Sequence, residues 1–147
     1  RLVHEKGLDI FAETIALLRG RGFDIRPMVI GDGPARDWIA RMLPNATFLG
    51  HLEGAELGEA VASSDLLINP SVTEAFGNVN LEAMASGLAV LSPNVPSAAA
   101  LTNDGVDGRL ISEYSPQAFA QAAMEIMADG AIQRRLMGLA ASRTADR

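Results

Sequence analysis

The chain has 147 residues, no cysteine, a net charge of −6 and a hydrophobic fraction of 48%. This length and composition are those of one globular domain with a real core. The acidic balance argues against a nucleic-acid partner, because phosphate backbones bind basic patches. The lack of cysteine excludes disulfides and thiolate metal sites.

Two further features of the sequence bear on location. No apolar run approaches the roughly 18 residues of a membrane span, and no basic and apolar leader of a secreted protein is visible. We therefore expect a cytoplasmic protein without a membrane span. Association of the full-length protein with a membrane surface stays open.

The first half of the chain alternates between helical and strand patterns. Leu8, Phe11 and Ile15 recur at helical spacing, which predicts an amphipathic helix. Pro27 suits the first position of a short buried strand, and Pro34 suits the first position of a helix. The expected elements are a helix over 8–19, a strand over 27–30, a helix that starts at 34, a strand over 47–49 and a helix over 54–63.

The second half continues the alternation. Leu66–Asn69 is apolar at successive positions rather than at every second one, which is typical of a central strand. We also expect a helix over 78–86, strands over 88–91 and 108–111, and helices around 119–127 and 132–139. Strands that alternate with helices predict an α/β fold, a doubly wound, Rossmann-like parallel sheet with helices on both faces, in a single domain.

Two acidic residues mark a candidate site. Glu74 follows a predicted strand and Glu82 lies about one turn into the next helix, at an edge where parallel sheets bind ligands. Asn78 is expected to cap this helix, and the backbone N–H groups near Phe76, Gly77 and Asn78 would form an electropositive cradle. Carboxylates beside such a cradle suit a ligand that carries sugar hydroxyls as well as phosphate.

The opening loop supplies cations in Arg1 and Lys6. In a doubly wound sheet this loop would follow a strand ahead of Arg1 and would lie at the same carboxyl edge. Arg offers a planar fork for phosphate oxygens and Lys a mobile point charge. Together they could hold a diphosphate and stabilise it as it departs.

Four motifs follow one another along the chain. In order, they are Arg-Leu-Val-His-Glu-Lys-Gly, Gly-Asp-Gly-Pro, Phe-Leu-Gly, and Thr-Glu-Ala-Phe-Gly-Asn-Val-Asn-Leu-Glu-Ala-Met-Ala-Ser-Gly. The series resembles the C-terminal donor-binding domain of family 4 retaining glycosyltransferases, the group 1 enzymes with a GT-B fold and a Glu-x7-Glu motif. The resemblance implies that residues 1–147 are a truncated donor-binding domain without its first strand and without the N-terminal acceptor domain.

The resemblance also implies an activity and its site. A hexose would pass with retention from a nucleoside-diphosphate sugar, GDP-mannose or UDP-glucose, to a hydroxyl of a carbohydrate or lipid acceptor, without a metal or cofactor. Arg1 and Lys6 would bind the diphosphate, and Glu74 would hold the transferred sugar. Glu82 would bind the ribose hydroxyls. The other donor contacts would come from His51, Leu52, Phe76, Gly77, Asn78 and Val79.

Parts of the sequence depart from the family pattern, and other functions stay open. Residues 94–100 lack the two glycines and the acid that relatives often carry there, so the role of this loop is undecided. Gly31–Pro34 is explained by turn chemistry alone. The alternatives are a nucleotide-sugar epimerase of the same architecture and a nucleotide-sugar binding module that is inactive alone. The opening motif with Arg1 and Lys6 favours the transferase.

Overall fold

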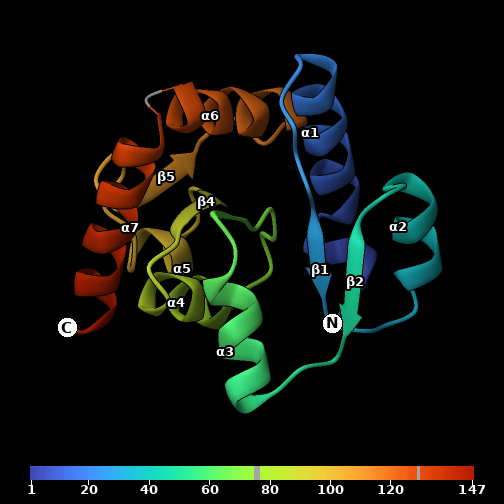
Figure 1. Ribbon diagram of the computed structural model, residues 1–147, viewed down its shortest axis with the longest axis horizontal. Coiled ribbons are helices and arrows are strands. Elements are labelled where there is room, and N and C mark those ends of the chain that lie inside the picture. Colours follow the sequence, from blue (N-terminus) through green and yellow to red (C-terminus); the bar gives the residue numbers. More distant parts are fainter. Residues whose placement is uncertain (75–76, 129) are drawn as a thin grey trace.

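The structure is a computed structural model that describes residues 1–74, 77–128 and 130–147 (Figure 1). Helices and strands alternate along most of the chain. The helices are the 3₁₀ helix η1 (His4–Lys6), α1 (Leu8–Gly20), α2 (Arg36–Met42), α3 (Gly54–Ala62), α4 (Asn78–Ala85), α5 (Pro96–Ala99), α6 (Pro116–Ala128) and α7 (Gly130–Ala145). The strands are β1 (Met28–Ile30), β2 (Thr47–Gly50), β3 (Leu66–Ile68), β4 (Ala89–Pro93) and β5 (Gly108–Ile111).

The strands pair in parallel, as the alternating pattern predicted. Among the described residues they form two sheets, one of order β1-β2 and one of order β3-β4-β5. The α/β architecture is therefore confirmed, but its strands are divided. Leu66–Asn69 was expected to be a central strand, whereas β3 is an edge strand that pairs only with β4 within the described chain. A continuous apolar run indicates that both faces of a strand are covered, but it does not indicate how many other strands pair with it.

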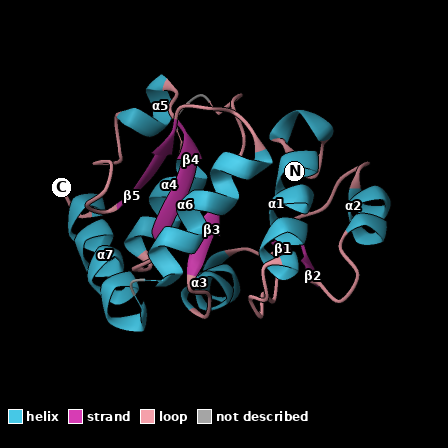
Figure 2. Cartoon of the chain, turned by 90° about the horizontal axis from the view of Figure 1, so that it is seen from above, coloured by secondary structure: helices cyan, strands magenta, loops and turns pink. Residues whose placement is uncertain are grey.

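Helices cover both faces of the β3-β4-β5 sheet (Figure 2). Successive side chains of β4 point to opposite faces. Leu91 packs with Leu18 of α1 and Phe119 of α6, whereas Val90 packs with Met84 of α4 and Ala141 of α7. β4 is buried at every position, so the predicted helices on both faces are confirmed for this sheet.

A second core surrounds the β1-β2 sheet. Val29 of β1 packs with Ile15 of α1 and Ile39 of α2. Three residues further along α1, Leu18 belongs instead to the core of the larger sheet. Because α1 contributes to both cores, it holds the two sheets together.

Some element boundaries differ from the sequence expectations. β4 runs to Pro93 instead of ending at Leu91, and Pro96 starts the short helix α5, which was not predicted. Helix α2 begins at Arg36 rather than at Pro34. No helix within the described ranges is both long enough and apolar enough to cross a membrane.

Candidate functional site

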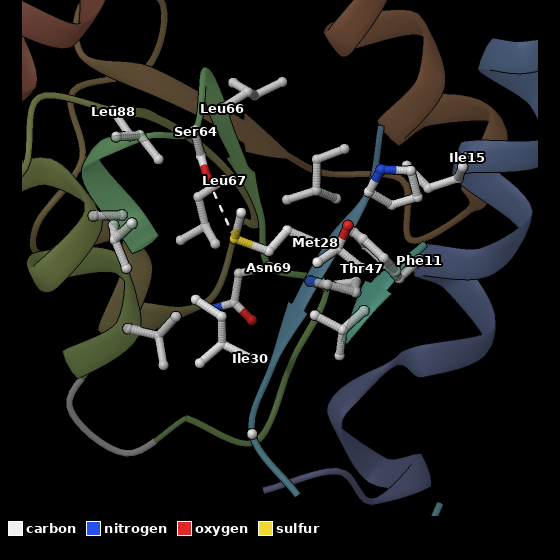
Figure 3. A pocket seen from close by; sticks show the side chains of 18 of the residues that line it. Phe11, Ile15, Met28, Ile30, Thr47, Ser64, Leu66, Leu67, Asn69 and Leu88 are labelled. Atoms are coloured by element: carbon white, nitrogen blue, oxygen red, sulfur yellow. Dashed lines mark hydrogen bonds between the residues drawn. The ribbon is translucent and has the colours of Figure 1, made fainter. Parts of the chain in front are cut away.

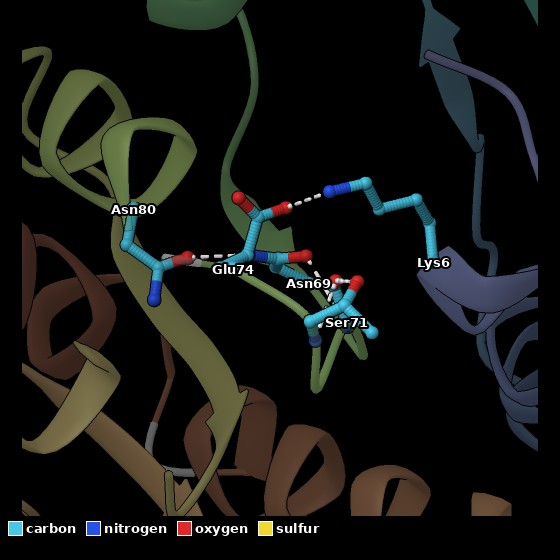
Figure 4. Close-up of polar contacts among 6 residues, drawn as sticks. Lys6, Asn69, Ser71, Glu74 and Asn80 are labelled. Atoms are coloured by element: carbon cyan, nitrogen blue, oxygen red, sulfur yellow. Dashed lines mark hydrogen bonds and ion pairs between the residues drawn. The ribbon is translucent and has the colours of Figure 1, made fainter. Parts of the chain in front are cut away.

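Two of the predicted site residues meet at the carboxyl ends of the strands. Lys6 ends η1, and Glu74 lies in the loop after β3. The Lys6 Nζ donates a hydrogen bond to Glu74 Oε1 at 3.0 Å (Figure 4). The side chains are 31% and 18% exposed, so the pair is partly shielded from water. The fold thus joins the opening loop to the glutamate loop, two segments that are far apart in the sequence.

The turn at Gly7 explains why the opening loop lies there. Gly7 has a left-handed φ of 76° and links η1 to α1. A Cβ on Gly7 would lie 2.8 Å from the carbonyl oxygen of Pro70, and also 2.8 Å from the Tyr114 hydroxyl. That hydroxyl donates to the same Pro70 oxygen at 2.8 Å. Burial, followed by the negative charge of Asp9, raises the pKa of Tyr114, which keeps the phenol protonated as a donor.

The turn after β1 positions the first residues of the chain. The backbone N–H of Leu2 donates to Asp32 at 2.9 Å, and the Leu2 carbonyl accepts from Ala35 at 3.0 Å. Gly33 packs so closely on the Leu2 backbone that a Cβ there would lie 2.5 Å from its oxygen. The Gly31–Pro34 turn therefore has the structural role that its turn chemistry predicted.

The helix of the glutamate motif begins differently from the prediction. Gly77, with a left-handed φ of 67°, is the N-cap of α4, and Asn78 is its first residue. The prediction that Asn78 caps the helix is wrong, because the N-cap position falls on Gly77 and no side chain donates or accepts a capping hydrogen bond there. Leu101 and Ser97 pack against Gly77, and a Cβ there would lie 3.1 Å from the Leu101 side chain. The backbone N–H groups that precede the first helical hydrogen bond, Leu81 to Gly77, lie at this end of α4.

A buried chain of polar side chains supports this helix start, and the sequence analysis did not find it. The Asn69 Nδ2 donates to Asn80 Oδ1 at 2.8 Å (Figure 4). The Asn80 Nδ2 in turn donates to Ser92 Oγ at 3.1 Å. Asn80 is 1% exposed. The chain ties α4 to the ends of β3 and β4. The only sequence signal was an asparagine one turn before Ala83 and Met84, on the apolar side of the helix.

The other predicted residues are more exposed. Glu82 and Val79 lie on α4, and both side chains are exposed. His51 is exposed beyond the end of β2, with its Nε2 2.8 Å from Glu53 Oε1. Arg1 is exposed at the start of the chain and takes part in no ion pair within the described residues.

One cavity of about 1110 Å³ joins most of these residues, and Figure 3 shows part of its largely apolar lining. Seven of the ten predicted site residues line it: Arg1, Lys6, His51, Leu52, Glu74, Val79 and Glu82. Gly77 and Asn78 are not among its lining residues, and Phe76 lies outside the described residues. Many of the other lining residues are apolar, among them the side chains of β1 and β3.

The described residues hold no group of three or more His, Asp and Glu side chains that is arranged to bind a metal ion. Among the predicted residues, two cations, Arg1 and Lys6, and two carboxylates, Glu74 and Glu82, line the cavity. This set of groups suits an anionic ligand that also carries hydroxyl groups.

An α/β domain of parallel strands covered by helices is of the Rossmann-like type, in which ligands bind at the carboxyl edge of the strands, where the Lys6–Glu74 pair lies. Residues 1–129 match the family model described as glycosyl transferases group 1. The chain therefore belongs to the group 1 glycosyl transferases, as its motifs predicted, and the family supports a transferase.

Curated relatives agree with this assignment. The GDP-mannose-dependent alpha-mannosyltransferase of Corynebacterium glutamicum is 37% identical over 129 residues, which are 88% of this chain and 30% of that protein. The alpha-D-kanosaminyltransferase of Streptomyces kanamyceticus is 26% identical over 142 residues, covering 92% of this chain and 37% of that protein. The chain thus spans about a third of the length of these relatives.

Solved structures show the same fold. The C-terminal domain of the group 1 glycosyl transferase LpcC from Francisella tularensis matches with a TM-score of 0.82 and 22% identity, covering 99% of this chain and 80% of that one. The complex of Anabaena Alr3699/HepE with UDP and glucose gives a TM-score of 0.83 at 23% identity, covering 99% of this chain and 41% of that one. The fold is that of a Rossmann-like domain of GT-B glycosyltransferases.

Proposed function

We propose that residues 1–147 are the donor-binding domain of a hexosyltransferase that uses a nucleoside-diphosphate sugar and retains the anomeric configuration. A separate N-terminal domain would bind the acceptor, a carbohydrate or a lipid. The main support is one observation: seven predicted site residues from separate segments line a single cavity, with Lys6 and Glu74 in contact at 3.0 Å. The LpcC domain, which is itself described as C-terminal, supports the assignment to the donor half.

Each polar group has a role that fits its surroundings. Lys6 and Arg1 would bind the diphosphate and stabilise the negative charge of the leaving group. Because Lys6 donates a hydrogen bond to Glu74, a diphosphate that binds Lys6 would compete with Glu74 for the ammonium group. The released carboxylate of Glu74 would then be free to accept hydrogen bonds from the sugar. The N-terminus of α4, with the backbone of Phe76, Gly77 and Asn78, would add further donors.

The second glutamate would bind the part of the donor that does not move. Glu82 is exposed on α4 and lines the cavity beside Val79. Its carboxylate can accept from both vicinal hydroxyls of a ribose. His51 and Leu52 line the cavity beyond β2 and would lie near the base. The mannosyltransferase relative favours GDP-mannose as donor, and the neighbour that binds UDP and glucose makes UDP-glucose the second candidate.

Calorimetric titration of the full-length protein with GDP and with UDP tests this function. We expect at least one nucleotide to bind with a Kd below about 1 mM. Its affinity should be the same with and without EDTA, because the proposed site needs no metal ion. If neither binds, the proposed function is wrong. Tighter binding of GDP would favour GDP-mannose, and tighter binding of UDP would favour UDP-glucose.

Single substitutions separate the proposed roles. Glu82→Gln should weaken nucleotide binding by about tenfold, because it loses charge-assisted hydrogen bonds to the ribose. Lys6→Met should weaken binding of the diphosphate by a similar factor but leave binding of a nucleoside unchanged. Glu13→Gln, on the exposed side of α1 and outside the cavity, is the matched control. Unchanged nucleotide affinity in the Glu82 variant would exclude its ribose role.

A further inference from the structure

The two loops that carry Lys6 and Glu74 meet at the carbonyl group of Pro70. Pro70 lies in the loop after β3, four residues before Glu74, and it lines the cavity. Gly7 directly follows Lys6, and a Cβ on Gly7 would lie 2.8 Å from the Pro70 oxygen. The close approach of these two backbones therefore sets how the turn with Lys6 lies on the loop with Glu74.

A hydroxyl group from a third loop is bonded at this contact. The Tyr114 hydroxyl donates to the Pro70 carbonyl at 2.8 Å, and it would also lie 2.8 Å from a Cβ on Gly7. Tyr114 belongs to the loop between β5 and α6, and it is not among the residues that line the cavity. Its hydroxyl thus touches both loops of the site from behind, outside the space in which a ligand would bind.

The Tyr114 ring is itself held by the core. It packs edge-to-face on Phe119, with ring centroids 6.4 Å apart and an interplanar angle of 82°, and Phe119 is fully buried. The next residue, Ser115, caps α6, because its hydroxyl accepts from the Ala118 N–H at 3.1 Å. Although Tyr114 is 44% exposed, its hydroxyl is therefore presented to Pro70 from a fixed support, which precise positioning requires.

Buried polar side chains hold the same loop from its other side. Asn69, directly before Pro70, donates to Asn80 at 2.8 Å. Its Oδ1 accepts from the Ser71 N–H at 3.4 Å, and the Ser71 hydroxyl accepts from the Thr73 N–H at 3.4 Å. Ser71 is 2% exposed. A chain of hydrogen bonds thus runs from α4 to the residue before the glutamate, with Pro70 inside the segment that it spans.

We propose that Tyr114 is a positioning residue of the donor site: its hydroxyl holds the Pro70 carbonyl and thereby fixes the Glu74 carboxylate relative to Lys6. The inference rests on the proposed function and adds to it a residue that does not touch the ligand. Lys6 would bind the diphosphate and Glu74 the transferred sugar, so their relative position matters for a ligand that carries both groups. Loss of the Tyr114 hydroxyl should therefore weaken binding of the intact donor but not of the nucleotide alone.

Amide hydrogen exchange of the full-length protein without nucleotide tests whether Tyr114 fixes the loop. Tyr114→Phe keeps the ring and removes only the hydroxyl. In this variant the amides of residues 69–74 should exchange at least about threefold faster than in the parent protein, as expected when one hydrogen bond that restrains a loop is lost. Ser115→Ala is the matched control, because it removes the neighbouring cap bond of α6 and leaves the contact with Pro70 in place. Equal exchange in Tyr114→Phe and the parent protein would overturn the proposal.

Calorimetric titration of the same proteins with GDP and GDP-mannose, and with UDP and UDP-glucose, tests the effect on the donor. In Tyr114→Phe the Kd of the nucleotide sugar should rise by about three- to tenfold, the range of one lost hydrogen bond. The Kd of the corresponding nucleoside diphosphate should change by less than about twofold, and Ser115→Ala should change neither value. Equal losses of both affinities, or no loss of either, would overturn the positioning role.

A double-mutant cycle shows whether Tyr114 acts through Glu74. In a Glu74→Ala background, Tyr114→Phe should cost no further affinity for the nucleotide sugar, because the group that it positions is already absent. Additive losses would contradict the proposal. If neither nucleotide binds to the parent protein, the proposed function is wrong, and the exchange comparison still decides whether Tyr114 fixes the loop.

Discussion

At the scale of single residues, the two glutamates of one motif lie in different environments. Glu74 is 18% exposed and is held by Lys6, whereas Glu82 is exposed on the helix surface. The sequence predicted both as hydroxyl acceptors, but it did not predict the contact with Lys6, because that contact depends on how the first loop and the third strand meet. The Glu74 side chain is therefore restrained by an ion pair, whereas the exposed Glu82 side chain is free to reorient.

A buried asparagine is the residue on which the helix start depends most. Asn80→Ala should lower the free energy of unfolding by about 2–4 kcal/mol, because Asn69 and Ser92 lose their buried partner and a small void remains. Urea unfolding followed by circular dichroism measures the change. Asn78→Ala in the same helix, at an exposed position, should change it by less than about 0.5 kcal/mol. Equal losses in the two variants would contradict the importance of the buried network.

Tyr114 gives the fold a defined response to alkaline pH. Burial disfavours the phenolate, and so does Asp9, so the folded pKa lies above the ordinary value of 10.0. The neutral phenol therefore contributes stability that is complete below pH 10 and is lost as the pH rises through the folded pKa. Tyr114 is the only tyrosine, so tyrosinate absorbance reports it alone. Its midpoint should lie above that of the urea-unfolded chain, and coincident midpoints would refute the shift.

At the scale of elements, strong local patterns predicted most helices and strands. Very short elements, and features that depend on tertiary contacts, were not predicted. The helical spacing of Leu8 to Ile15 predicted α1 within a residue at its end, and the apolar run at Leu66 predicted β3. The four-residue helix at Pro96 has no room for a periodic pattern. Local sequence could not predict the edge position of β3 either, because strand pairing depends on segments that are distant in the chain.

The junction between η1 and α1 depends on a glycine. Gly7→Ala should destabilise the domain by about 1–3 kcal/mol, because alanine must adopt a left-handed φ and its Cβ meets the Pro70 carbonyl. It should also move Lys6 away from Glu74 and weaken nucleotide binding. Gly58→Ala is the matched control: Gly58 lies inside α3, where a Cβ would meet nothing within 4 Å. That control should be neutral or stabilising by up to about 1 kcal/mol, and thermal unfolding distinguishes the two.

At the scale of the whole molecule, the sequence predicted at which edge of the fold the candidate site residues lie. It did not predict the contacts between these residues. Motif order placed Arg1, Lys6 and Glu74 at one edge, and all three line the same cavity. The chain order of the strands could not reveal that two sheets leave a space between them, because that space is set by strand pairing. The buried Asn69–Asn80–Ser92 network was missed for a related reason: its three members come from different elements.

The proposed division of labour between two domains leads to a prediction for the isolated chain. It contains the proposed donor groups, but a transfer reaction also needs an acceptor hydroxyl held near the anomeric carbon of the sugar. We therefore expect residues 1–147 to release no nucleoside diphosphate from GDP-mannose or UDP-glucose above the background rate, with or without an added acceptor, whereas the full-length protein releases it only when the acceptor is present. A coupled assay for the free nucleoside diphosphate measures both.

Incubation of the full-length protein with the donor alone distinguishes a transferase from an epimerase. An epimerase would convert the sugar of the donor without any acceptor, whereas a transferase leaves it unchanged, since its leaving group departs only when an acceptor hydroxyl takes the sugar. Proton NMR of the sugar's anomeric signal distinguishes the two outcomes. Conversion of the donor alone would favour the epimerase, and transfer by residues 1–147 alone would show that a complete active site lies within this one domain.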